Sequence, residues 1–370
     1  MKVAFFLGSL NRGGTETLIL DVFKKRANAS FDMILLYRNE GELSDEYRIT
    51  GVPMIRLKPN GSKIGYFLEI KKLLKREKVD ILHAQTLTNA LIGIICTSFS
   101  NVKLVFTFHG LFTAPRFNWI RHLIIWRANA IIFVSKFIRD WYYCHTVFCP
   151  RGKCHVVYNG IDSRKMEIRY PVPDFLDQYE SEHTVRLSMV GNFVSGRSQI
   201  VVCKALKLLR DTGTAFQFFF VGGKKEQESW LFDECVSFCK ENGLSDCVHF
   251  VGSRGDVPAI LQHIDGFVYS TKHDTFGISV IEAVMAGVPT LTNDWAVMKE
   301  ISNNWEYFDS FISGDDRNCC VKIQELINNI DNRKEYALMI SSQVKEVYSI
   351  NNHINLLGRL YQSLYSGKRK

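Results

Sequence analysis

Short apolar runs rich in β-branched and aromatic residues alternate with amphipathic stretches along the chain. In the first half the apolar runs lie at 3–7, 33–37, 55–57, 81–83, 104–108 and 131–134. In the second half they lie at 187–190, 216–221, 248–251, 267–269 and 290–292. Strands that alternate with helices in this way pair in parallel, so the pattern predicts an α/β fold with crossover helices.

The pattern breaks once, between the two sets of strands. A turn signal at 159–162 precedes a polar segment with two prolines, so residues 169–185 are expected to link a first domain, 1–168, to a second domain, 186–349. A length of 370 residues suits two domains of ordinary size. The tail, 350–370, carries apolar residues at helical spacing and is expected to form a helix that docks on the first domain.

Composition narrows the class of protein. No run approaches the roughly 20 apolar residues of a membrane-spanning helix, and the apolar N-terminus fits a buried strand better than a signal peptide. The ten cysteines include no Cys-x-x-Cys pair, so reduced thiols and a cytoplasmic location are expected. The net charge of +8 suits an anionic partner, but the basic residues form no recognisable nucleic-acid motif, which disfavours nucleic acid.

Two loops of the first domain carry candidate chemistry. After the first strand, Gly13 and Gly14 precede a helix, without the lysine of a P-loop and without the three spaced glycines of a dinucleotide fingerprint. A nucleoside triphosphatase and a nicotinamide dehydrogenase are therefore disfavoured, and either a ligand-binding turn or a tight structural turn remains. At the end of the fifth strand, His109 either binds a ligand or is structural.

The second domain is more informative. Arg197 follows a strand, where a guanidinium can bind a diphosphate or simply lie exposed in a loop. In 270–283 a strand stops, a loop with Lys272 turns, and a helix is expected to begin near Gly277 with its free amides directed at a ligand. Glu282 lies more than one turn inside that helix, where it suits the hydroxyls of a ribose. A capping Asp274 and a salt-bridged Glu282 are the structural alternatives.

At this segment the sequence resembles the family 4 retaining glycosyltransferases of the GT-B fold, and the resemblance extends over almost the whole chain. The family pattern is an acidic residue, seven residues and a glutamate, with Phe-Gly between them. Here it is formed by Asp274, Phe276, Gly277 and Glu282. The other matching landmarks are Gly13–Gly14 with Glu16, His109–Gly110, Ser135, 159–162, and Gly191 with Arg197.

The resemblance implies two Rossmann-like domains that face each other across a cleft, with the donor held by the second. It implies that Glu282 binds the donor ribose and Asp274 a hydroxyl of the transferred sugar. The expected catalytic residues are His109, Arg197 and Asp274. The expected donor-binding residues are Gly13, Gly14, Arg197, Lys272, Thr275, Phe276, Gly277, Ile278 and Glu282, and Arg254 is a candidate for the nucleotide base.

Two departures from the family pattern concern the donor site. Asn192 stands where the family usually has an arginine, and Asp274 is one methylene shorter than the usual glutamate. Lys272 is hypothesised to restore the missing positive charge. No Asp-x-Asp motif is present, so no cofactor and no obligatory metal are expected.

The expected activity is retaining transfer of a hexose-type sugar from a nucleoside-diphosphate sugar to a glycan or lipid-linked saccharide, in surface polysaccharide or glycoconjugate synthesis. The segment 116–127 mixes aromatic residues with arginines, so it is either a peripheral contact with the inner face of the membrane or an ordinary helix packed on the sheet. The basic run 71–78 is open to the same two interpretations. A nucleotide-sugar epimerase of the same fold and a non-catalytic sugar-nucleotide-binding subunit remain as alternatives.

Overall fold

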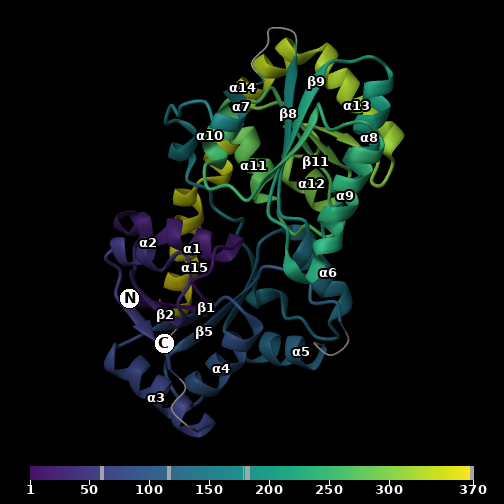
Figure 1. The fold of residues 1–370 in the computed structure, drawn as a ribbon. Helices are drawn as coiled ribbons and strands as arrows, with labels where there is room; N and C mark the ends of the chain where they lie inside the picture. Colours follow the sequence, from purple (N-terminus) through teal and green to yellow (C-terminus); the bar gives the residue numbers. More distant parts are fainter. Residues whose placement is uncertain (59–61, 115–117, 178, 180–183, 367–370) are drawn as a thin grey trace. The chain divides into compact units, whose positions relative to one another are not determined.

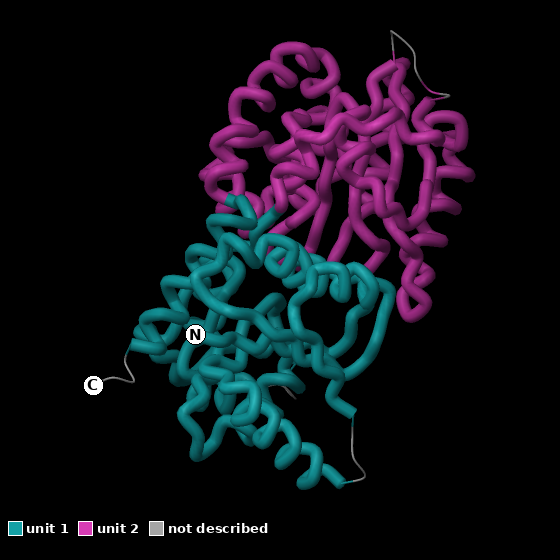
Figure 2. The backbone as a smooth tube through the Cα atoms, turned by 90° about the vertical axis from the view of Figure 1, so that its left-hand side faces the viewer, with its two compact units in different colours: residues 1–161, 348–370 teal, residues 162–347 magenta. Residues whose placement is uncertain are grey.

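The chain divides into two compact units, which Figure 2 colours separately, and each unit has its own sheet. The computed structural model describes residues 1–58, 62–114, 118–177, 179 and 184–366. The first unit comprises Met1–Ile161 with Tyr348–Lys370, and the second comprises Asp162–Val347. Residues 178 and 180–183 of the expected linker, 116–117 of the aromatic and basic segment, and 367–370 of the basic end lie outside the described residues.

The first unit is built on a parallel sheet with the strand order β3-β2-β1-β4-β5-β6-β7. Figure 1 labels β1, β2 and β5 of this sheet. Its strands are β1 (Lys2–Ser9), β2 (Asp32–Asn39), β3 (Met54–Arg56), β4 (Ile81–Ala84), β5 (Lys103–Phe108), β6 (Ala130–Phe133) and β7 (Cys154–Val156). The six strands predicted for the first half all form. Strand β7 was missed because its three residues are only half-buried at the sheet edge and form no apolar run.

Helices connect these strands and cover the sheet. They are α1 (Gly14–Lys24), α2 (Ser44–Ile49), α3 (Lys63–Arg76), α4 (Leu87–Thr97), α5 (Asn118–Arg127), α6 (Lys136–His145) and the C-terminal α15 (Ile350–Ser366). Side chains cap several of them: Ser62, Thr86 and Ser135 each accept a backbone N–H of the first turn of α3, α4 and α6.

The C-terminal helix α15 packs on the first unit, as its apolar spacing predicted. Ile354, Leu357 and Tyr361 lie in the same buried cluster as the residues of β1 and α1. The approach is close, because a Cβ on Gly160 would lie 2.6 Å from the His353 Cβ and 2.7 Å from the Ile350 Cα. Gly160 therefore supplies the space in which α15 begins.

The second unit repeats the topology, with a parallel sheet in the order β10-β9-β8-β11-β12-β13. Its strands are β8 (Val185–Val190), β9 (Phe216–Val221), β10 (Val248–Gly252), β11 (Gly266–Tyr269), β12 (Thr290–Asn293) and β13 (Asp309–Phe311). Its helices are α7 (Asp174–Asp177), α8 (Gln199–Asp211), α9 (Ser229–Glu241), α10 (Val257–Gln262), α11 (Ile278–Met285), α12 (Ala296–Ile301), α13 (Asp316–Asn328) and α14 (Ile330–Tyr348). Strand β13 was missed for the same reason as β7, since Asp309 and Ser310 break any apolar run.

Both sheets reverse their strand order at one point, between β1 and β4 in the first unit and between β8 and β11 in the second. Open parallel sheets bind ligands at such switch points, beyond the carboxyl ends of the strands. The prediction of two Rossmann-like α/β domains is thus confirmed. Among the described residues, no helix is both long enough and apolar enough to cross a membrane.

Candidate active site

The loops after β8 and β11 lie side by side, because these two strands are neighbours in the second sheet. The Thr271 hydroxyl donates to the Gly196 carbonyl at 2.8 Å, and the Lys272 amide donates to the same carbonyl at 3.0 Å. The Ser198 amide donates to the Ser270 carbonyl at 3.1 Å. The two loops that carry Arg197 and Asp274 are thereby fixed to each other.

Arg197 is a fixed cation rather than an exposed loop arginine. Its Nη1 lies 3.1 Å from Asp274 Oδ2, and its guanidinium lies 5.0 Å from the ring centroid of Tyr269. The side chain is only 22% exposed, and its buried Nε has no hydrogen-bond partner among the described residues. Burial opposes the charge, but the Tyr269 hydroxyl and the Asp274 carboxylate raise the pKa of Arg197, so the guanidinium stays protonated.

Asp274 caps its own loop. One carboxylate oxygen, Oδ1, accepts the backbone N–H groups of Thr275, Phe276 and Gly277 at 2.7, 3.2 and 3.2 Å. The other, Oδ2, accepts the Tyr269 hydroxyl and faces Arg197. The capping alternative therefore describes Asp274 well, and the short aspartate side chain suits it because the carboxylate folds back onto the adjacent amides.

Tyr269 is the main residue of this site that sequence reasoning missed. It was taken as the last residue of a buried strand, which it is, with its side chain fully buried. Its hydroxyl donates to Asp274 and its ring faces Arg197, and burial raises the pKa of Tyr269 well above its usual range. The hydroxyl of a buried tyrosine needs a hydrogen-bond partner. Because Tyr269 lies at the carboxyl end of its strand, this requirement could have indicated a polar partner in the following loop.

Helix α11 begins at Ile278, next to the predicted start. Gly277 precedes it with φ +85°, a left-handed conformation that favours glycine. The Ser279 hydroxyl donates to the Val190 carbonyl at 3.1 Å and so ties the first turn of α11 to the end of β8. Glu282 is half-buried on the second turn of the same helix. Thr275, Phe276, Gly277, Ile278 and Glu282 thus belong to one loop-to-helix segment beside Arg197.

Lys272 and Asn192, the two residues invoked for the leaving-group charge, differ in their surroundings. Lys272 is exposed, and within the described part of the chain its ammonium makes no hydrogen bond or ion pair. Asn192 has a structural contact, since its Oδ1 accepts the Gly223 amide at 2.8 Å. Asn192 therefore connects the loop after β8 to the loop after β9. An arginine at this position could not accept the Gly223 N–H, because its side chain has no acceptor.

Arg254, the candidate for the nucleotide base, is held by two carboxylates. Its guanidinium donates to Asp256 at 2.6 and 2.8 Å and to Asp174 at 3.3 Å, and it lies 5.0 Å from the ring centroid of Phe175. It follows β10, which β9 separates from β8. Among the described residues, Arg254 thus makes its hydrogen bonds and ring contact with Asp256, Asp174 and Phe175 rather than with Arg197 or Asp274.

The first unit carries the remaining candidates. Gly13 has an extended backbone before α1, where a Cβ would lie 2.6 Å from Glu16 Oε2. The Glu16 carboxylate thus lies against the turn that holds Gly13 and the exposed Gly14, and burial raises the pKa of Glu16. A side chain at Gly13 would displace that carboxylate from the start of α1.

His109 lies at the carboxyl end of β5. Its Nε2 donates to Gln85 Oε1 at 2.7 Å, because an amide oxygen can only accept. Burial lowers the pKa of His109 to about 3, so the imidazole is neutral at physiological pH. His109 is therefore suited to a hydrogen bond with a hydroxyl rather than to proton donation.

Metal-ligating residues do not cluster in the described part of the chain: no three His, Cys, Asp or Glu side chains lie close enough together there to hold an ion. Arg197 and Lys272 supply positive charge in the loops after β8 and β11.

Two family models match the chain, Glycosyltransferase Family 4 over residues 12–165 and Glycosyl transferases group 1 over residues 184–329. The chain is 21% identical over 318 residues to the O-antigen biosynthesis glycosyltransferase WclY of Escherichia coli, covering 81% of this chain and 82% of the relative. It is 22% identical over 300 residues to the UDP-Gal:alpha-D-GlcNAc-diphosphoundecaprenol alpha-1,3-galactosyltransferase of Escherichia coli, covering 76% of each.

A solved structure shows the same fold. Anabaena Alr3699/HepE in complex with UDP and glucose matches with a TM-score of 0.86 at 15% identity, over 98% of this chain and all of that one. At 15% sequence identity, this structural similarity shows a shared fold only. Because the two family models match successive halves of the chain and its relatives are glycosyltransferases over most of their length, this protein is a glycosyltransferase of family 4 with the GT-B fold.

Proposed function

We propose that the protein transfers a hexose from a uridine-diphosphate sugar to a lipid-linked saccharide during surface polysaccharide synthesis, with retention at the anomeric carbon. The observation that carries the proposal is the loop pair after β8 and β11, where Arg197 lies beside the N-terminus of α11. Family membership favours transfer over the epimerase and over the non-catalytic subunit.

The donor diphosphate is assigned to this loop pair. Because Asp274 already accepts the N–H groups of Thr275, Phe276 and Gly277, the anion is assigned to the backbone N–H groups of Ile278 and Ser279 in the first turn of α11, and the helix dipole adds to that preference. Arg197 is held by Asp274 and Tyr269, so it needs little reorganisation when a ligand binds. Glu282 is assigned to the ribose hydroxyls, and the uridine base is suggested by the names of a relative and of a similar structure.

Catalysis is assigned to stabilisation of the leaving group. When the bond between the anomeric carbon and the phosphate oxygen breaks, negative charge develops on the nucleoside diphosphate. A fixed guanidinium and helix-end amides stabilise that charge better than water, which must reorient. Arg197 and Lys272 are proposed to supply the positive charge, without an obligatory metal.

The acceptor is assigned to the first unit, around Gly13, Gly14 and His109. A neutral His109, oriented by Gln85, presents an imidazole that can bond a sugar hydroxyl. A lipid-linked acceptor is suggested by the diphosphoundecaprenol in the name of one relative. We accordingly place the protein on the cytoplasmic face of the membrane, in peripheral contact with it.

The test is a transfer assay with EDTA present. The full chain is incubated with UDP-glucose, UDP-galactose or their N-acetyl forms and with a polyprenyl-diphosphate-linked saccharide, and the product is analysed by mass spectrometry and NMR. An extended saccharide with the anomeric configuration of the donor is expected. An inverted product would refute retention, and transfer that needs a divalent cation would refute metal independence.

A further inference from the structure

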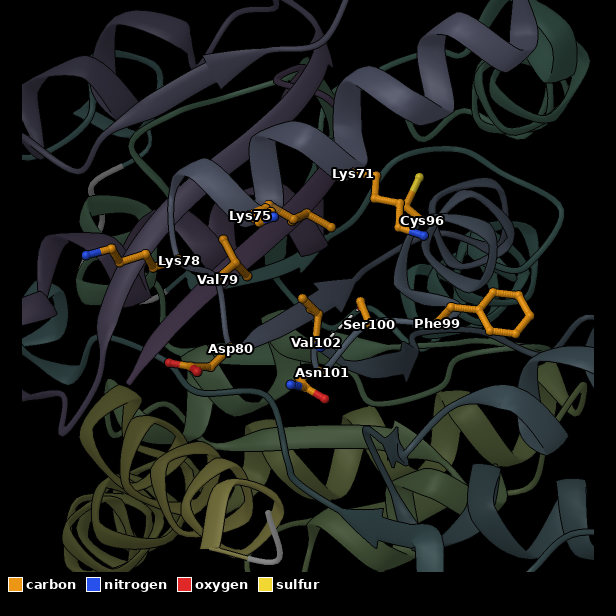
Figure 3. Close-up of a pocket in the computed structure, with 11 residues that line it drawn as sticks. Lys71, Lys75, Lys78, Val79, Asp80, Cys96, Phe99, Ser100, Asn101 and Val102 are labelled. Carbon is orange, nitrogen blue, oxygen red and sulfur yellow. Dashed lines mark hydrogen bonds between the residues drawn. The ribbon is translucent and has the colours of Figure 1, made fainter. Parts of the chain in front are cut away.

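A pocket lies in the first unit, between the carboxyl ends of α3 and α4 (Figure 3). Its volume is about 500 Å³, within the usual range for ligand pockets. Lys71, Lys75 and Lys78 line it from α3 and the turn after it, and Phe99, Ser100 and Asn101 line it from the turn after α4. We call it the α3–α4 pocket. It lies at the amino ends of β4 and β5, the edge of the sheet opposite to His109.

Positive charge dominates this pocket. Lys71 donates to the Ser98 carbonyl at 3.1 Å, whereas the ammonium groups of Lys75 and Lys78 have no ion pair within the described ranges. Asp80 is the acid that lines the pocket, and one of its oxygens already accepts the Lys2 amide at 3.0 Å. A lysine in the last turn of α3 complements the helix dipole, which accounts for Lys75 but not for the other two.

Two backbone conformations at the rim are unusual. Lys78 ends α3 with φ +52°, and Phe99 follows α4 with φ +58°. Glycine or asparagine is the usual residue where a helix ends in the left-handed region, and a bulky aromatic residue there is an outlier. The chain nevertheless has a lysine and a phenylalanine at these positions, both lining the pocket. Such outliers point to function when the side chains gain something from the placement.

Exposed apolar side chains flank the lysines. The Phe99 side chain is fully exposed, and Ile95, one turn earlier on α4, is 50% exposed. On α5, Trp126 is also exposed, and the adjacent Arg127 donates to the Ser98 hydroxyl at 2.9 Å. The apolar and basic groups therefore occur together around the carboxyl end of α4.

We propose that the α3–α4 pocket binds the phosphate head group of an anionic phospholipid, while Phe99 and Ile95 enter the interfacial region of the bilayer. Charge alone would suit any phosphate. A soluble phosphate, however, makes no use of the exposed Phe99, whereas the head-group region of a bilayer offers anionic phosphate and apolar contact together. The proposal does not rest on the transferase reaction, because lipid binding needs neither donor nor acceptor.

The test is sedimentation of the full chain with vesicles. Vesicles of phosphatidylcholine with one third phosphatidylglycerol are expected to bind the protein, and vesicles of phosphatidylcholine alone are not. Loss of two positive charges alone corresponds to roughly 30-fold, so the double variant Lys75→Glu with Lys78→Glu, which reverses both charges, is expected to bind the anionic vesicles at least about 30-fold more weakly. Its matched control is Lys204→Glu with Lys240→Glu, two exposed lysines of the second unit, which gives the same net charge and is expected to bind like the wild type.

The apolar contribution has its own variant. Phe99→Asn places a residue that tolerates positive φ at the rim, so the fold is expected to keep its stability while vesicle binding weakens. Ile49→Asn, at an exposed position on α2, is the control and is expected to bind normally.

Several outcomes would overturn the proposal. Failure of the wild type to bind anionic vesicles, equal binding to neutral vesicles, or equal binding by the two double variants would each do so. Soluble glycerol phosphate that stabilises the protein against heat as much as the vesicles do would instead identify a site for a soluble anion. Binding to polyglutamate without binding to vesicles would point to an acidic protein partner.

Discussion

Asp274 combines a capping and an ion-pairing contact, so Asp274→Ala and Asp274→Asn should destabilise the second unit by different amounts. Alanine removes the acceptor for three backbone amides, for the buried Tyr269 hydroxyl and for Arg197. Asparagine keeps an oxygen for the amides but loses the charge opposite Arg197. The difference between the two variants measures the cap together with the contact to the Tyr269 hydroxyl, and the asparagine variant measures chiefly the ion pair.

The structure sets the magnitudes. Loss of a capping side chain costs about 1 kcal/mol. Removal of one partner from a buried ion pair costs about 3–5 kcal/mol. The lower end of this range applies here because the Arg197 side chain is 22% exposed to solvent. Asp274→Asn should therefore cost about 3 kcal/mol and Asp274→Ala about 4 kcal/mol. Arg197→Met with Asp274→Asn should cost less than the sum of the single changes, since neither charge is left unpaired.

The assay is differential scanning calorimetry of the full chain. In a unit of this size 1 kcal/mol corresponds to about 2–4 °C, so Asp274→Ala should lower the melting temperature of the second unit by roughly 10 °C. The control is Asp233→Ala, which removes an exposed partner of Lys224 and should cost at most about 1 kcal/mol. The reasoning fails if Asp274→Ala and Asp233→Ala have the same melting temperature. It also fails if the destabilisations by Arg197→Met and Asp274→Asn are additive in the double variant.

Three further results are expected. Gly160→Ala should destabilise the first unit by about 1–3 kcal/mol in urea titrations, because its Cβ would meet the start of α15, whereas Gly152→Ala, with open space around it, should be neutral. Burial lowers the pKa of His353 to about 4 and that of His109 to about 3, so unfolding takes up protons below pH 6.5, and His353 alone should contribute up to about 1.4 kcal/mol per pH unit to the loss of stability as the pH falls from 6.5 to 4. His353→Asn should reduce that slope and His145→Asn, at an exposed position, should not; a slope unchanged in both would contradict the assignment. Lys272→Ala should lower turnover without changing the melting temperature, and unchanged turnover would remove Lys272 from the leaving-group site.

The strands could be predicted from the sequence because buried parallel strands are continuous apolar runs. Strands β7 and β13 could not, since polar residues interrupt their short segments and leave no apolar run, so pairing with the neighbouring strand fixes them. The structural role of Gly160 could not be predicted from the sequence either. Its place in a family landmark was visible, but the reason for a glycine, the close approach of α15, needs the tertiary structure.

The candidate site was predicted in position but not in its internal contacts. The segment from Thr275 to Glu282 and Arg197 do lie together, as strand adjacency and the family pattern indicated. The hydrogen bonds of Asp274 to its own loop and to Tyr269 depend on backbone geometry that spacing does not reveal. For the same reason Asn192 was interpreted only as a missing cation, although its side chain bonds the Gly223 amide. The donor-contact roles of these residues stay predictions.

The most direct test of the central claim is donor binding and hydrolysis by the wild type and by Glu282→Ala, without metal and without acceptor. We predict that uridine diphosphate and one uridine-diphosphate hexose raise the melting temperature of the wild type, and that slow hydrolysis of that donor is lost in Glu282→Ala. If no nucleoside diphosphate stabilises the wild type, the assignment of the donor to the loops after β8 and β11 is contradicted.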